Sequence, residues 1–185
     1  MFSFRRLAAV FAATSALALA ASAGGFADSS TVTATVTGGS LSESTASTPS
    51  VSATLNGTDQ VKPYTILIDT NDPTGSGNGW NLTITSTTFT TTSPVHTLST
   101  GASSVTGVVS ACKQGTCTAP TNAISYPFTV PAAGTPPTAV KLFNAAANTG
   151  MGEFNITPTV DVTIPANAYA GTYTSTVTLA IVSGP

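Results

Sequence analysis

Hydrophobic and polar residues alternate along several stretches of the chain, and the clearest stretch is residues 79–85. Trp80, Leu82 and Ile84 fall two residues apart, with Asn and Thr between them. This period of two predicts a β-strand with one buried and one solvated face, running to about Phe89. The stretch contains the only tryptophan of the chain, so we expect the remaining strands to cover its apolar face.

The same alternation predicts further strands before and after this one. We expect a hairpin between the strand at residues 64–68 and the Trp80 strand, and a linker-like segment at residues 40–49, which is rich in Ser and Thr. Strands at this spacing, with turn residues between them and no long helical pattern after the first residues, predict an all-β fold. The expected architecture is an antiparallel β-sandwich of the Ig-like or Greek-key type. The predicted strands are residues 31–37, 51–55, 64–68, 104–109, 125–130, 140–143, 154–164 (interrupted at Pro158) and 173–181.

The first residues have the pattern of a helical secretory signal peptide. Arg5 and Arg6 precede an apolar run at residues 7–21, and small residues follow it. Cleavage after Ala23 and cleavage after Ala27 both fit, and Ala27 is favoured because a polar, strand-like sequence follows directly. The run is short for a membrane span. We therefore expect a signal peptide at residues 1–27 and one β-sandwich domain at residues 28–185.

Charge is sparse in this chain. Charged residues make up 6% of it, and the formal net charge is −2, which becomes −4 without Arg5 and Arg6. Such a chain has no basic patch for nucleic acid. Solubility must therefore come mainly from hydroxyl and amide groups.

The two cysteines, Cys112 and Cys117, lie five positions apart. Export favours a disulfide, which would fix one local loop. A redox pair is the alternative, but the spacing is not Cys-x-x-Cys.

The sequence offers few parts for an active site. His96 is the only histidine, no Gly-x-Ser-x-Gly elbow accompanies it, and the acidic residues are scattered. Asp69, Asn71, Asp72 and Asn78 lie in one glycine-bearing stretch that would suit calcium, but such residues also form ordinary turns. We expect no catalytic, metal or cofactor site, so the protein is not expected to be an enzyme.

The motif formed by Trp80, Asn81 and Leu82 resembles the signature of WxL-domain cell-surface proteins. Leu179 stands where the distal motif of that family often has a second tryptophan. The resemblance implies a secreted bacterial surface protein that associates non-covalently with the cell wall, through peptidoglycan. Further similarity lies at residues 83–85, 89, 96–98, 101–102, 144–152, 164–169, 171–173 and 177–179.

Six residues are candidates for binding, either through the motif or as aromatic and amide groups near the last strand. The spacing of Trp80 with Leu82 and Ile84 favours a core position for its ring, as does that of Tyr173 with Val177 and Leu179. A position in a turn favours exposure of Tyr169. The six candidates are Trp80, Asn81, Leu82, Asn167, Tyr169 and Tyr173.

The sequence fits two functions of different kinds. A secreted hydrolase is a third and less favoured hypothesis. The first is a structural or adhesive wall protein that binds glycan, held without a covalent bond because no sortase-type motif stands before Pro185. The alternative is a subunit of a surface fibre or a multi-protein surface complex, joined through exposed strand edges. Other surface proteins are then possible partners, and no membrane span is expected in the mature chain.

Overall fold

The computed structural model describes residues 28–185. The chain divides into the units Met1–Thr35 and Val36–Pro185, and the strands found in the described residues lie in the second unit. The predicted signal peptide and its cleavage after Ala23 or Ala27 lie outside the described residues. Among the described residues there is no helix whose length and hydropathy would suit a membrane crossing.

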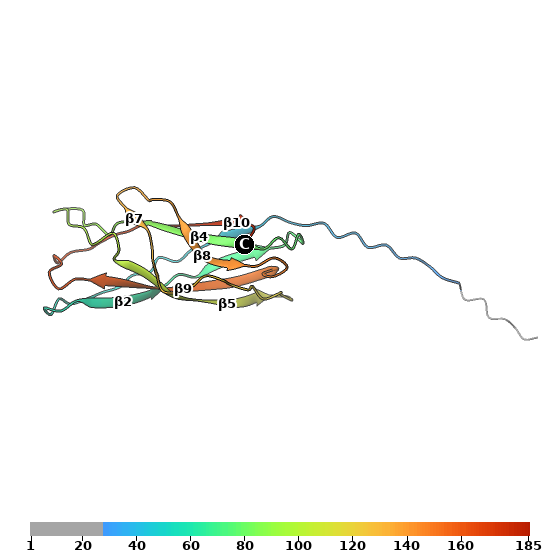
Figure 1. The fold of residues 1–185 in the computed structure, drawn as a ribbon, viewed down its shortest axis with the longest axis horizontal. Helices are drawn as coiled ribbons and strands as arrows, with labels where there is room; N and C mark the ends of the chain where they lie inside the picture. Colours follow the sequence, from blue (N-terminus) through green and yellow to red (C-terminus); the bar gives the residue numbers. More distant parts are fainter. Residues whose placement is uncertain (1–27) are drawn as a thin grey trace, which may run out of the picture. The chain divides into compact units, whose positions relative to one another are not determined.

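The second unit is an antiparallel β-sandwich, as predicted. Figure 1 shows β2, β9 and β5 in one layer, with β4, β7, β8 and β10 in the other. The first sheet consists of β1 (Ser42–Ser44), β2 (Gln60–Thr65), β3 (Ile68–Asp72), β5 (Ser103–Gln114), β6 (Phe128–Thr129) and β9 (Gly152–Ile164). The second consists of β4 (Trp80–Thr87), β7 (Ala132–Ala133), β8 (Val140–Ala145) and β10 (Val177–Ser183).

β9 is the central strand of the first sheet. One of its edges pairs with β5, while the other pairs first with β3 and then with β2. Pro158 lies at the position where the partner changes, and its carbonyl accepts a hydrogen bond from the Ile66 N–H at 3.3 Å. The N–H and C=O of one strand residue point to the same edge of the strand. Proline has no N–H, and at position 158 that missing donor would point into the gap between β2 and β3, so no ladder hydrogen bond is lost. The predicted interruption at Pro158 is therefore wrong, since β9 continues through it.

β4 is the central strand of the second sheet. β10 pairs with one edge of β4, and β8 and β7 pair with the other. The predicted strand at residues 64–68 is divided into the ends of β2 and β3, and both belong to the first sheet. The predicted hairpin between this strand and the Trp80 strand is therefore wrong. The two segments follow each other in sequence but lie in opposite layers.

The core between the sheets is centred on the Trp80 strand, as the alternation predicted. Trp80, Leu82 and Ile84 are fully buried or nearly so. They pack in one cluster with apolar residues of the other sheet. The members from that sheet include Ile68, Val105, Phe154, Ile156 and Val160.

Two predicted strands near the beginning of the domain are wrong. Within the part of the chain that the structure describes, residues 31–37 and 51–55 have no strand pairing, and all of them are exposed. Between them, in the segment expected to be a linker, Ser42–Ser44 forms β1 and pairs with β3. Alternation predicts which faces a strand would have, but it does not provide the partner that makes an extended segment a strand.

Candidate functional site

Two loops lie side by side at the end of the sandwich where β9 ends. We call them the paired loops: residues 88–98, which follow β4, and residues 165–176, which precede β10. Thr90 and Thr174 exchange two backbone hydrogen bonds of 3.0 Å, which join the loops. The first loop is closed by a bond of 2.9 Å from the Thr91 N–H to the His96 carbonyl. These contacts hold two otherwise irregular segments in a fixed relative position.

The paired loops present an exposed aromatic surface. The Tyr169 side chain is 64% exposed, and its ring stacks on that of His96 with centroids 3.8 Å apart and planes 7° apart. The Tyr173 hydroxyl donates a hydrogen bond of 3.0 Å to the Tyr169 carbonyl, which fixes the loop beneath the ring. We call the stacked pair the tyrosine platform. Since His96 covers one face of the Tyr169 ring, the exposed area belongs to the opposite face and the edge.

A small pocket lies beside the platform. It has a volume of about 200 Å³, and residues of both paired loops line it. Hydroxyl groups dominate its polar lining, because Thr91, Thr92, Ser93 and Thr172 contribute to it. The Thr91 hydroxyl is engaged with the Pro94 carbonyl at 2.6 Å, whereas Thr92, Ser93 and Thr172 are exposed.

A larger groove, which we call the edge groove, shares residues 170–172 with this pocket as part of its lining. Its volume is about 1020 Å³. The groove lies between the β2 and β9 part of the first sheet and the beginning of β10. Residues 47–55 also line it, as a segment without strand structure. Its apolar lining includes Tyr64, Ile66, Phe89, Leu98, Val162, Ile164, Val177 and Leu179.

The six predicted binding residues divide into a buried and a surface group. Trp80, Asn81 and Leu82 are at most 5% exposed, so their side chains offer no surface to a ligand in this structure. The Trp80 Nε1–H donates to the Gly150 carbonyl at 2.9 Å, and the Asn81 amide donates to the Gly184 carbonyl. The other three candidates belong to the paired loops. Asn167 and Tyr169 are exposed and Tyr173 is half-buried.

The predicted disulfide between Cys112 and Cys117 is present. It closes the turn after β5, and the next residue is anchored to the residues directly before β9. The Thr118 N–H donates to the Met151 carbonyl at 2.9 Å, and the Gly150 N–H donates to the Thr118 carbonyl at 2.8 Å. The disulfide therefore fixes a local loop against the adjacent strand.

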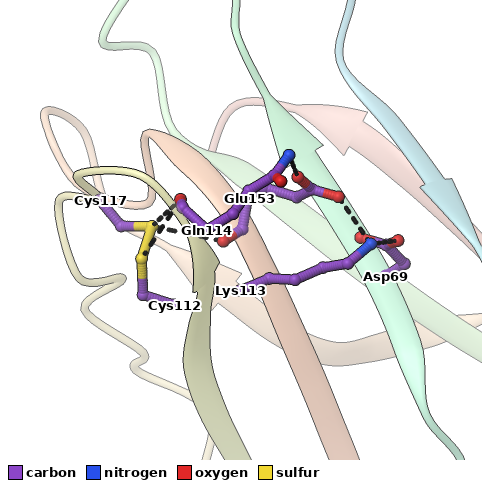
Figure 2. Close-up of polar contacts among 6 residues, drawn as sticks. All are labelled: Asp69, Cys112, Lys113, Gln114, Cys117 and Glu153. Atoms are coloured by element: carbon purple, nitrogen blue, oxygen red, sulfur yellow. Dashed lines mark hydrogen bonds and ion pairs between the residues drawn. A yellow bond between two sulfur atoms is a disulfide. The ribbon is translucent and has the colours of Figure 1, made fainter.

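A charged cluster lies beside this disulfide, at the opposite end of β9 from the paired loops. Figure 2 shows the Lys113 ammonium between Asp69 and Glu153, with the Gln114 amide also donating to Glu153. Hydrogen bonds to Asp69 and Glu153 raise the pKa of Lys113 above its ordinary value. Asp69 lies in β3, so the carboxylate that the sequence placed in a candidate calcium loop is instead part of an ion pair joining three strands.

His96 has a different surrounding from a catalytic histidine. Among the described residues, only the backbone N–H and carbonyl of His96 form hydrogen bonds, to the backbone and hydroxyl of Thr91, and its ring contacts Tyr169. The described residues also contain no group of three or more His, Cys, Asp or Glu side chains that would suit a metal ion. The stack with Tyr169 was missed at the sequence level because the two residues are 73 positions apart, and no local pattern joins them.

Comparison with protein families gives one match. The family model of the WxL domain, described as surface cell wall-binding, matches residues 23–185. No curated protein and no solved structure matches the chain.

Proposed function

Because the chain belongs to the WxL family of surface cell wall-binding domains, we propose that it binds the glycan of peptidoglycan through the tyrosine platform, in a structural or adhesive role. Wall association and a cell-surface location follow from the family itself. The choice of glycan, the site and the non-covalent mode are the proposal. The observation that carries it is the exposed Tyr169 ring, held flat on His96 at the junction of the paired loops.

The platform suits a sugar ring for a physical reason. The face of an aromatic ring carries a partial negative charge, and the C–H groups on one face of a pyranose carry a partial positive charge, so the two surfaces attract. The stack on His96 fixes the orientation of Tyr169 before binding, which lowers the entropic cost of ordering the ring. Among the six candidates, Tyr169 is the aromatic residue with the most exposed ring.

The neighbouring pocket supplies polar groups of the right kind. Thr92, Ser93 and Thr172 carry hydroxyls that both donate and accept hydrogen bonds, as sugar hydroxyls do. Asn167, exposed in the adjacent turn, adds an amide with the same capacity. Neither paired loop contains Asp, Glu, Lys or Arg, so the proposed contacts are uncharged.

Co-sedimentation of the purified protein with washed sacculi tests this proposal. We expect the wild-type chain to pellet, Tyr169→Ala to remain largely in the supernatant, and Tyr169→Phe to pellet as the wild type does because it keeps the ring. Val109→Ala is the matched control, since it removes a side chain of similar exposure, 68%, from β5. Equal pelleting of Tyr169→Ala and the wild type would exclude the platform as the site.

The proposal assigns no catalysis to the chain. The family is one of wall-binding domains, and His96 serves the platform. Incubation of the protein with peptidoglycan in a gel should therefore give no clearing zone. Clearing that the His96→Ala variant loses would contradict this part of the proposal.

A further inference from the structure

Residues 31–37 form a strand-like segment that takes part in no strand pairing within the described residues. Val32, Ala34 and Val36 alternate with four threonines, as in a strand with one apolar face. All seven residues are exposed, Val32 to 90% and Val36 to 93%. No charged residue lies between Asp28 and Glu43. Proteins usually protect such a segment with charges or proline, because an unprotected strand pairs with another chain.

The edge groove has the features that such a segment needs. In the described residues, β2 pairs only with β9 and β10 only with β4, so each has an edge outside any ladder. The groove between them has a floor that includes Ile66, Val162 and Leu179. Its volume of about 1020 Å³ is at the upper end of pockets that enclose drug-sized ligands, which leaves room for a chain segment.

The present cover of the edge groove is weakly attached. Residues 48–55 are all exposed. The hydrogen bond described for them runs from the Gln60 amide to the Thr54 carbonyl, at 2.6 Å. Val51 and Leu55 keep 37% and 40% of their side-chain surface in solvent, although an apolar groove lies beneath them. This segment could therefore move aside without breaking strand pairing.

From these observations we propose that residues 31–37 of one copy enter the edge groove of a second copy as an added strand. The segment pairs with the free edge of β10 and directs Val32, Ala34 and Val36 into the groove. Main-chain hydrogen bonds then provide affinity, and the alternating side chains provide register, as in other cases of strand addition. Neither the segment nor the apolar lining of the groove carries a charge that would be buried unpaired.

The positions of donor and acceptor favour a head-to-tail contact. The segment joins the sandwich at Gly39, whose N–H donates to the Pro73 carbonyl at 2.9 Å, next to the pair of Asp72 with Gly152. Gly152 begins β9, whereas the groove residue Val162 lies ten positions further along it. At about 3.3 Å per residue, the two points are roughly 30 Å apart. The segment and the groove are unlike surfaces at opposite ends of the sandwich, so each copy can bind one copy through its segment and another through its groove. Such a head-to-tail contact gives an open filament unless the copies close into a ring.

The test compares two double variants of the exported chain over a range of concentrations, by light scattering and electron microscopy. We expect the wild type to form rods whose length increases with concentration. Val32→Asp with Val36→Asp should remain monomeric, because charges would enter the apolar groove. Thr33→Asp with Thr35→Asp is the matched control and should still assemble, because these positions face away from the groove. A monomeric wild type at every concentration, or equal loss of assembly in both variants, would overturn the proposal.

A peptide provides a second measurement that does not depend on filament growth. A synthetic peptide of residues 29–38 should bind the Val32→Asp, Val36→Asp protein, whose own segment cannot occupy a groove, and should shorten wild-type rods by blocking acceptors. The same peptide carrying both aspartates should do neither. Absence of peptide binding to the folded variant would also overturn the proposal.

Discussion

At the scale of single residues, Trp80 and Gly150 depend on each other. The Trp80 ring is completely buried, tilted against Phe143 with centroids 5.8 Å apart, and it donates to the Gly150 carbonyl. Gly150 has φ 72°, and a Cβ added there would lie 2.7 Å from Trp80 Nε1. A larger residue at position 150 would therefore be strained in its backbone and would displace the tryptophan.

Removal of the Trp80 ring should destabilise the domain strongly. Trp80→Ala should lower the free energy of unfolding by about 3–5 kcal/mol, because it leaves a large cavity and an unpaired Gly150 carbonyl. Denaturant unfolding followed by far-UV circular dichroism measures this change. Val109→Ala, at an exposed position, should change the free energy little. An unchanged midpoint for Trp80→Ala would contradict the core role of the ring.

Tyr64, which lines the edge groove, should make stability depend on alkaline pH. Burial raises the pKa of Tyr64 to about 12 from an ordinary value of 10.0. The unfolded chain therefore releases this proton first, so the free energy of unfolding falls as the pH rises from about 10 to about 12. Tyr64→Phe should remove the decrease in the free energy of unfolding that is due to Tyr64. The decrease that is due to the raised pKa of Lys113 should remain.

Unfolding curves of the wild type and Tyr64→Phe at several pH values between neutral and alkaline provide the measurement. An identical pH dependence in the two proteins would show that the pKa of Tyr64 is the same in the folded and the unfolded state.

At the scale of strands and loops, the sequence predicted the elements whose apolar face is buried in the core. β4 appears close to its predicted bounds, and β9 and β10 contain most of the residues expected of them. The wrong strands at residues 31–37 and 51–55 alternate as well as the correct ones do. Pairing decides the difference, and it depends on residues far away in sequence. The same reason explains the missed division of residues 64–68 between β2 and β3.

The candidate site was predictable in part for a related reason. A turn rich in Pro, Ala and Asn predicted exposure of Tyr169, which is exposed, as is the candidate Asn167 in the same turn. The partner ring of His96 comes from a loop 73 positions earlier in the sequence, held there by the pair of Thr90 with Thr174. The burial of Trp80 followed from its period, so its place in the core was also predictable.

The disulfide between Cys112 and Cys117 should contribute modestly to stability. A closed loop this short reduces the entropy of the unfolded chain by an amount worth about 2 kcal/mol. Cys112→Ser with Cys117→Ser should therefore lower the free energy of unfolding by roughly that amount and leave the fold intact, as urea unfolding and circular dichroism can measure. Loss of the folded state in the double variant would show that the loop supports more than its own turn.

At the scale of the whole molecule, low charge and uncharged paired loops govern how the protein meets the wall. The formal net charge is −2, and the loops that carry the tyrosine platform contain none of the four charged residue types. Attraction to anionic wall polymers is therefore not expected to contribute, since like charges repel.

Wall binding should consequently depend little on salt. The screening length falls from about 30 Å at 0.01 M to about 3 Å at 1 M salt, which would weaken an ionic contact but not stacking or hydroxyl contacts. The pelleted fraction in the sacculus assay should be similar at both salt concentrations. Release at high salt alone would mean that charged groups elsewhere on the molecule, such as Lys62 or Lys141, make the contact.

The location of the paired loops and of Gly39 at opposite ends of β9 has a mechanical consequence. If glycan holds the loops while a load pulls on the chain at Gly39, the force runs along the strands. Ladder hydrogen bonds are perpendicular to their strands, so this force shears them together instead of peeling them one at a time. β4 and β10 alone share seven paired positions. A sandwich loaded in this direction resists tension better than one pulled apart at an edge, which suits a protein held on a wall under turgor.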